Sequence, residues 1–115
     1  MKILNRSLIL IVIISLSNLV VAQTHTPRYV SMAPTTNGYY EYLPDDYTTN
    51  TSANYPLLIF FPGIGEVGNG SAAELPRVLA NGTPKQIQQG IFPRSFTVNG
   101  QTFKFIVLTP QFTSY

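Results

Sequence analysis

A glycine-rich stretch, Pro62–Gly70, has the residue types best suited to chemistry. It reads PGIGEVGNG and directly follows an apolar run, Leu57–Phe61. Where a strand continues into glycine-rich backbone, unpaired amide groups lie at the carboxyl end of a sheet, and open α/β folds bind ligands there. Such amides can cradle a phosphate, or form an oxyanion hole that stabilises the negative oxygen of an acyl-transfer intermediate. A tight turn with no further role would also explain the glycines.

Phosphate binding is the least favoured of these interpretations. The spacing G-x-G-x-x-G occurs at 63–68, but Glu66 places a negative charge where a phosphate would sit. The next helix signal begins only after Gly70, and a lone match of this motif is weak. From the loop alone, an oxyanion hole and a purely structural turn remain equally open.

The remaining groups of a hydrolytic site are not apparent in the sequence. No G-x-S-x-G pentapeptide occurs, and the single histidine, His25, is expected in solvent. The serines considered as nucleophiles are interpreted as turn and cap hydroxyls; they are Ser71, Ser95 and Ser114. Cysteine is absent, which excludes disulfides, iron–sulfur clusters and thiolate zinc sites. We expect neither a metal nor a cofactor.

Two apolar runs without alternation are typical of strands covered on both faces, as in a parallel sheet. They are Leu57–Phe61, which we expect to be an interior strand, and Phe105–Leu108. Upstream, Gly38–Leu43 alternates its aromatic residues and ends at Pro44, which favours an edge or near-edge strand. These strands must position the glycine-rich loop.

Short helices and a hairpin are predicted between the two apolar runs. One helix is expected over about Leu75–Ala80, and a second begins with the cap Thr83 and ends at Gly90. Asn99-Gly100 between short apolar segments indicates a hairpin. The order of edge strand, buried strand, helices and buried strand predicts an α/β fold, opening a mostly parallel sheet.

Residues 1–22 have the pattern of a secretory signal peptide, with a basic start, the apolar stretch Leu8–Leu16 and a small-residue cleavage site ending at Ala22. A retained membrane anchor is the alternative, but polar residues interrupt a stretch already shorter than the usual span of about 20 residues. We therefore expect a secreted or periplasmic protein with no stable membrane anchor. Removing Lys2 and Arg6 lowers the formal charge from +2 to zero, which argues against nucleic-acid partners.

Four stretches in fixed order carry a resemblance to a known family. They are Tyr39–Tyr47, Tyr55–Phe61, Gly63–Gly68 and Phe105–Gln111. Together they resemble the N-terminal part of exported bacterial α/β-hydrolase-fold esterases and related peptidases. In that family a tyrosine-rich strand ends in YLP, a PLL-[IV]-F strand leads to a His-Gly-x-Gly-Glu-x-Gly loop, and an F-I-V-x-x-P-Q strand follows.

The resemblance implies a partial α/β-hydrolase fold, incomplete on its own. Residues 23–37 would form an extended N-terminal arm, and 38–115 the truncated N-terminal part of the hydrolase domain. The chain would be a fragment of a secreted serine hydrolase acting on ester bonds, lacking nucleophile, acid and base. Its full-length parent would take a small-molecule or polysaccharide-linked ester.

By the same resemblance, the amide of Ile64, or that of Gly63, would be an oxyanion donor. Glu66 would be the characteristic acid of the loop, with a solvent-facing turn residue as the alternative. Pro62 stands where the family usually has histidine, which removes a backbone donor from the loop.

A small secreted carbohydrate-binding or adhesion module without catalysis is the alternative function. Its motivation is a set of tyrosines able to stack on sugars: Tyr39, Tyr40, Tyr42 and Tyr47. Packing within a twisted sheet would equally explain them. Because buried-type strands without neighbours expose apolar edges, we expect the chain expressed alone to be prone to aggregation.

Overall fold

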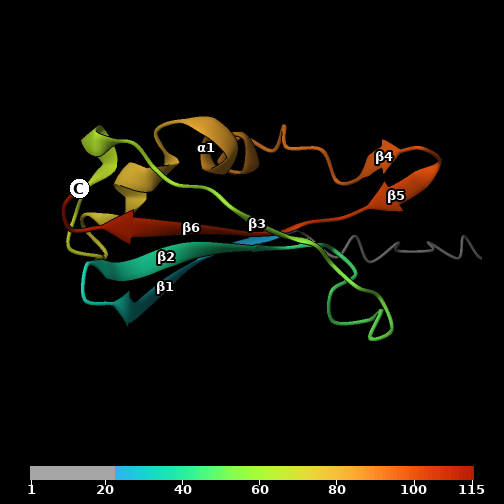
Figure 1. Cartoon of the computed structure of the whole chain (residues 1–115), viewed down its shortest axis with the longest axis horizontal. Helices are drawn as coiled ribbons and strands as arrows, with labels where there is room; N and C mark the ends of the chain where they lie inside the picture. Colours follow the sequence, from blue (N-terminus) through green and yellow to red (C-terminus); the bar gives the residue numbers. More distant parts are fainter. Residues whose placement is uncertain (1–22) are drawn as a thin grey trace, which may run out of the picture.

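The computed structural model describes residues 23–115, so the predicted signal peptide lies outside the described residues. Most of the described chain is organised around one four-stranded sheet (Figure 1). Its strands are β1 (Thr24–Ala33), β2 (Thr36–Leu43), β3 (Leu57–Ile59) and β6 (Ile106–Phe112). Smaller elements complete the fold: the 3₁₀ turns η1 (Ile64–Glu66) and η2 (Leu75–Leu79), the helix α1 (Gly82–Gln88), and the strands β4 (Phe96–Val98) and β5 (Gln101–Phe103).

The sheet has the strand order β1-β2-β6-β3. β2 is antiparallel to both β1 and β6, whereas β3 runs parallel to β6, with Leu58 opposite Val107. The near-edge position predicted for Gly38–Leu43 is confirmed, because β1 occupies the edge beside β2. Residues 23–37, expected as an extended arm, contribute β1, the short turn and the first two residues of β2.

The predicted α/β class, with its mostly parallel sheet and partial α/β-hydrolase fold, is contradicted. The described chain is mostly β: a mixed four-stranded sheet, a two-stranded antiparallel sheet and one α-helix. Two local causes are visible. Residues 24–43 double back as an antiparallel hairpin, β1–β2, which periodicity did not indicate. The stretch predicted as the first helix forms only the short 3₁₀ turn η2, with Pro76 in its first turn.

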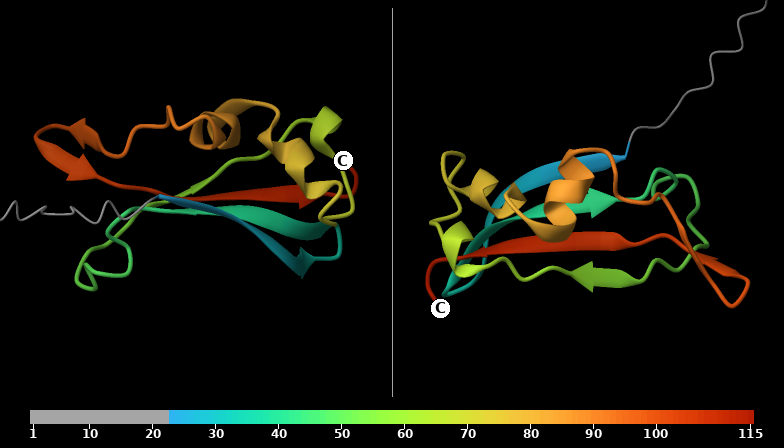
Figure 2. Two further views of the ribbon diagram at one scale, coloured as in Figure 1. Left: turned by 180° about the vertical axis from the view of Figure 1, so that it is seen from behind. Right: turned by 90° about the horizontal axis from the view of Figure 1, so that it is seen from above.

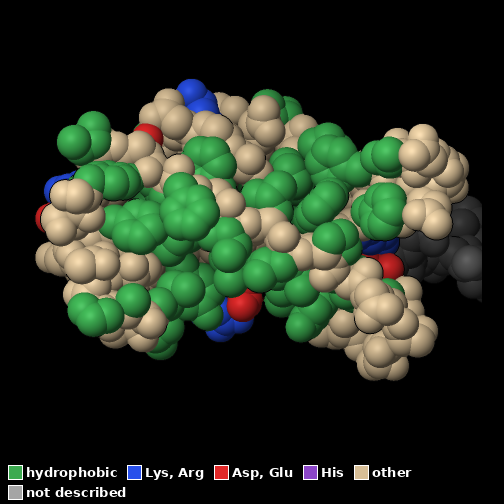
Figure 3. Space-filling model, in the orientation of Figure 1, with side chains coloured by type: hydrophobic (Ala, Val, Ile, Leu, Met, Phe, Trp, Pro, Cys, Tyr) green, Lys and Arg blue, Asp and Glu red, His purple; other side chains and the backbone are tan. Residues whose placement is uncertain are grey.

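The interior position predicted for Leu57–Phe61 is also wrong. β3 is an edge strand, and Leu57, Ile59 and Phe61 are 54%, 47% and 67% exposed. Only one side of β3 has a partner strand among residues 23–115, so a continuous apolar run does not bring burial with it. Figure 3 shows apolar side chains spread over the face of the molecule that carries β3.

The core lies between one face of the sheet and the segment that contains η2 and α1 (Figure 2). Tyr40 packs with Leu75 and Val78 from η2. A second cluster joins Tyr42, Phe92 and Val107, with partly buried side chains packed around it: Leu58, Ile87, Phe96 and Phe105. Alternation along β2 therefore directs Tyr40 and Tyr42 to the two core clusters, whereas Tyr39 points to the opposite face.

The hairpin prediction is confirmed. β4 and β5 are antiparallel, and the connecting residues Asn99 and Gly100 have φ angles of 50° and 76°. Positive φ at both positions is typical of a type I′ turn, which Asn-Gly favours. Within residues 23–115, no helix is long and apolar enough to cross a membrane.

Candidate functional site

The glycine-rich loop follows β3 and turns immediately into η1. Gly63 has extended backbone, and the Glu66 amide donates a hydrogen bond of 3.0 Å to the Gly63 carbonyl. The Glu66 side chain folds back over this turn. Its Oε2 accepts the Gly63 amide, and its Oε1 accepts the Asn81 side-chain amide at 2.5 Å.

Glu66 is therefore an internal clamp, and the alternative of a solvent-facing turn residue is excluded by its exposure of 6%. Buried carboxylates require hydrogen-bond donors, and here Gly63 and Asn81 supply them. Both carboxylate oxygens are engaged, Oε2 by Gly63 at the start of the turn and Oε1 by Asn81 from outside it. The residue predicted as the acid of the loop thus fixes the shape of the backbone around it.

The two predicted oxyanion donors differ in availability. The Gly63 amide is directed into the Glu66 carboxylate. The Ile64 amide donates no hydrogen bond to any residue in the described part of the chain, and the Ile64 side chain is 81% exposed. Of the two, only Ile64 leaves its amide available for an outside acceptor, because the first amides of a helical turn have no partner within it.

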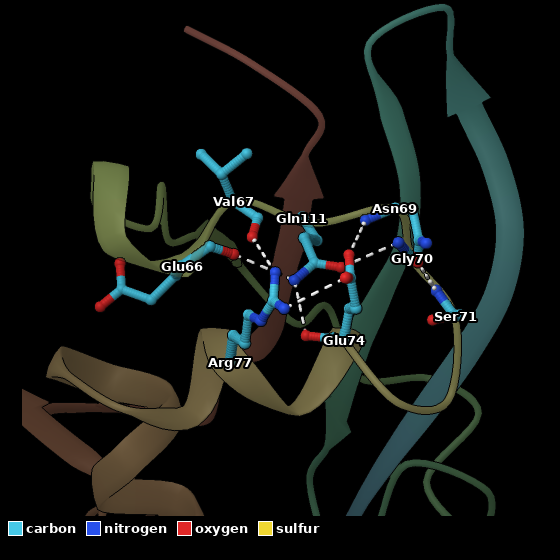
Figure 4. Close-up of polar contacts among 8 residues, drawn as sticks. All are labelled: Glu66, Val67, Asn69, Gly70, Ser71, Glu74, Arg77 and Gln111. Carbon is cyan, nitrogen blue, oxygen red and sulfur yellow. Dashed lines mark hydrogen bonds and ion pairs between the residues drawn. The ribbon is translucent and has the colours of Figure 1, made fainter.

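A buried glutamine that the sequence analysis did not single out holds the second half of the loop (Figure 4). Gln111, near the end of β6, is fully buried. Its Nε2 donates to the carbonyls of Glu66 at 3.0 Å and Glu74 at 2.8 Å, and its Oε1 accepts the Gly70 amide at 2.9 Å. One side chain thus satisfies three backbone groups across the loop.

The signal for Gln111 was present in the strand pattern. Val107, Thr109 and Gln111 alternate on one face of β6, and each is at most 1% exposed. A polar side chain on the buried face of a strand indicates a group with hydrogen-bond partners. The resemblance included this glutamine in its last stretch but assigned it no role.

Two glycines of the loop are required by close packing. Gly68 donates its amide to the Phe112 carbonyl at 2.9 Å, and a Cβ at this position would lie 2.6 Å from Gln111 Nε2. Gly70 has a φ of +74°, and its Cβ would lie 1.5 Å from the Asn37 carbonyl oxygen. The structural explanation of the glycines therefore holds for these two positions.

Charged residues on the outer side of the loop complete its support. Glu74 Oε2 accepts the Asn69 amide at 2.8 Å, while Arg77 donates to the Val67 carbonyl at 2.9 Å. Arg77 and Glu74 also form an ion pair of 3.1 Å. Because both side chains are partly exposed, this pair is worth at most about 1 kcal/mol. Its main effect is to hold two backbone groups in place.

Pro62, which stands where the resembled family has histidine, has a packing role. Pro62 is buried, and its carbonyl accepts the Tyr115 hydroxyl. Next to it, the rings of Phe61 and Phe112 stack with centroids 5.9 Å apart and an interplanar angle of 11°. Tyr115 lies against Phe112 at 5.8 Å. The start of the loop is thus held to the end of β6 by aromatic contacts.

The structure does not assemble a nucleophile and base from the residues it describes. Ser71, Ser95 and Ser114 are exposed, and neither ring nitrogen of His25 hydrogen-bonds to a serine. No group of three or more His, Cys, Asp or Glu side chains within 23–115 could hold a metal ion. The described site therefore consists of backbone donors and the side chains that position them.

His25 departs from its predicted solvent exposure. It lies in β1, is partly buried, and packs against the Tyr40 ring with centroids 4.9 Å apart. Burial lowers the pKa of His25 from its ordinary value, and the nearby Gln88 side chain offsets part of that effect. Its role in the structure is packing between β1 and β2.

Comparison with known proteins adds no family to this description. No protein-family model matches the chain, and no curated protein matches it either.

Proposed function

We propose that this chain is the N-terminal part of a secreted serine hydrolase that cleaves ester bonds, with the Ile64 amide as an oxyanion donor. The nucleophile, acid and base would come from residues outside the given sequence. The substrate would be a small-molecule or polysaccharide-linked ester. One observation supports the proposal above the others: Glu66 closes the η1 turn onto Gly63 and leaves the adjacent Ile64 amide without a partner among the described residues.

The physical case rests on preorganisation. An oxyanion donor is effective when it is already aimed at the position where charge develops, because no reorganisation is then needed during the reaction. Asn81 and Gly63 hold Glu66, and Glu66 in turn sets the backbone of η1. A donor of this kind is worth about 3 kcal/mol in the transition state. Glu66 is a positioning residue in this proposal.

The test uses the protein encoded by the reading frame continued past Tyr115. We expect the continued sequence to supply a serine nucleophile, an acidic residue and a histidine, and the purified protein to hydrolyse p-nitrophenyl acetate. In Ile64→Pro the backbone donor is removed, while the first position of a helical turn tolerates proline and the extended Gly63 suits the residue before it. We expect kcat to fall by about 100–1,000-fold with KM little changed.

Ile64→Ala is the matched control, because it keeps the amide and removes only an exposed side chain. Its kcat should stay close to that of the wild type. Urea unfolding of both variants separates loss of the donor from loss of the fold. The proposal is overturned if the continued sequence contains no such nucleophile, or if a folded Ile64→Pro protein keeps full activity.

A further inference from the structure

The tyrosines that suggested sugar binding are divided by the structure. Tyr40 and Tyr42 are 8% and 1% exposed and belong to the two core clusters, so they cannot form a stacking platform. Tyr47 differs, because it is 41% exposed and lies beyond the end of β2. Its ring faces Tyr55, with centroids 5.6 Å apart and a tilt of 51°.

These two tyrosines belong to the segment 45–55, which projects from the sheet at the end opposite Tyr115 (Figure 1). Two hollows meet on this segment. The larger, about 430 Å³, is lined by Tyr47, Thr48, Asn50, Thr51, Ala53 and Tyr55. The smaller, about 150 Å³, shares Asn50, Ala53 and Tyr55 and extends to Lys104. Ligand sites typically measure about 300–1,000 Å³, which the larger hollow satisfies.

The segment is ordered by its own hydrogen bonds. The Asp46 carbonyl accepts the amides of Thr49 at 3.1 Å and Asn50 at 2.8 Å, together with the Tyr55 hydroxyl at 3.3 Å. The Asn50 carbonyl accepts the Ala53 amide at 3.2 Å. Tyr55 is therefore tethered, and the half-exposed Tyr47 ring is presented on a preformed turn. Preorganisation of this kind reduces the entropy that binding must overcome.

Charge is compensated at the base of the segment. Lys104 lies 2.8 Å from Asp45 and 3.1 Å from Asp46, and Arg94 lies 3.6 Å from Asp45. These hydrogen bonds to Asp45 and Asp46 raise the pKa of Lys104. The acidic and basic groups thus pair with one another, and the larger hollow is lined only by aromatic, hydroxyl, amide and methyl groups. That lining suits an uncharged ligand.

We infer that the larger hollow on segment 45–55 binds a neutral carbohydrate, with one sugar ring stacked on Tyr47. A sugar ring has an apolar C–H face and a rim of hydroxyls, and the hollow offers the complement of both. The Asn50 side-chain oxygen already accepts the Ser52 hydroxyl at 3.2 Å, which leaves its amide hydrogens for a sugar hydroxyl. The inference is independent of the proposed ester hydrolysis, because the loop that carries Ile64 lies at the other end of the sheet (Figure 2).

The test titrates the full chain with cellohexaose, xylohexaose and maltohexaose while tyrosine fluorescence is recorded. The absence of tryptophan leaves tyrosine as the emitting residue. Heteronuclear NMR then locates any response along the backbone. We expect at least one hexasaccharide to saturate below about 10 mM, a weak affinity in the millimolar range, with shifts centred on 47–55. Tyr47→Ala should raise Kd about tenfold or more, whereas Tyr47→Phe, which keeps the ring, should retain binding.

Tyr29→Ala is the matched control. Tyr29 is 57% exposed and lines a different hollow, beside Asn37 and Asn69. The inference is overturned if none of the three sugars gives a response at about 10 mM, or if Tyr29→Ala weakens binding as much as Tyr47→Ala does. It is also overturned if Tyr47→Phe loses binding while its amide spectrum remains that of the folded chain. Loss of esterase activity would affect none of these readouts.

Discussion

Two adjoining regions, the loop segment 66–74 and the strand β3, are held in the structure in opposite ways. The loop is tied down by polar contacts, above all by the fully buried Gln111. β3 is rich in apolar residues, yet Leu57 and Ile59 remain about half exposed, and only β6 pairs with it among the described residues. The buried polar groups of the loop thus have their hydrogen-bond partners, whereas the apolar side chains of β3 are only partly buried.

The difference shows where the geometry of the candidate site comes from. Hydrophobic burial stabilises a strand only to the extent that something covers it, at about 25 cal/mol per Å² removed from water. Buried hydrogen bonds instead specify one arrangement, because any other leaves a polar group unsatisfied. The loop near Ile64 is therefore positioned by Gln111 and Glu66 more than by the apolar strand that leads to it.

Removing Gln111 should have the largest effect. Gln111→Leu keeps much of the side-chain volume but leaves the Gly70 amide and the carbonyls of Glu66 and Glu74 without this partner. Each buried unsatisfied group costs about 1–3 kcal/mol, so with three such groups we expect the free energy of unfolding to fall by at least about 3 kcal/mol. Urea unfolding followed by circular dichroism measures the change.

Gln111→Glu sharpens this result, because a carboxylate can accept from Gly70 but cannot donate to the two carbonyls. It should also be strongly destabilising. Gln101→Leu, at an exposed position of β5, is the control and should change stability by less than about 0.5 kcal/mol. If the substitutions at 101 and 111 lower the free energy of unfolding equally, the hydrogen bonds of Gln111 do not hold the loop, and the comparison of loop and strand fails.

The glycines of the loop allow a narrower test. Gly68→Ala would place a methyl group 2.6 Å from Gln111 Nε2, whereas a methyl group at Gly65 would meet nothing within 4 Å. We expect Gly68→Ala to destabilise the fold by about 1–3 kcal/mol through overpacking. Gly65→Ala should be close to neutral. Thermal unfolding of the two variants measures the difference. If Gly65→Ala proves the more destabilising, the packing of the loop against Gln111 does not determine the loop geometry.

The sequence predicted features whose signals are local. Asn99-Gly100 gave the hairpin because both residues accept positive φ. Gly90, at a φ of 71°, follows the end of α1 close to where the capping pattern predicted it. The alternation of Gly38–Leu43 gave a strand beside the sheet edge. In each case the residues that decide the conformation are neighbours in sequence.

The features that the sequence did not predict depend on contacts between distant segments. Gln111 bonds to residues 37, 41 and 45 positions away, and no local pattern encodes such partners. The apolar run Leu57–Phe61 specifies a strand but not how many strands pair with it. The prediction of an interior position was therefore wrong. Of the candidate site, the sequence indicated the glycine-rich loop, and the resemblance named the amides of Ile64 and Gly63, whose role as oxyanion donors stays a prediction. The inward role of Glu66 required the geometry.

The smallest effect on stability, but a clear one on solubility, is expected at the exposed Ile59 of β3. Ile59→Lys places a charge on an edge strand at a side chain that is 47% exposed. We expect the free energy of unfolding to change by less than about 0.5 kcal/mol. Aggregation of the chain expressed alone should decrease, because a lysine on an open edge opposes pairing with another chain. Static light scattering against protein concentration measures this.

Leu58→Ala gives the contrasting result within the same strand. Leu58 packs against the cluster of Tyr42, Phe92 and Val107, so truncating it should cost up to about 2 kcal/mol. Two consecutive residues of β3 would then have different roles: Leu58 contributes to the core, and Ile59 promotes association between chains. If Ile59→Lys instead unfolds the chain, the exposed side of β3 must be covered by other groups in solution. The strand would then be held by burial, and it would differ from the loop only in using apolar rather than polar contacts.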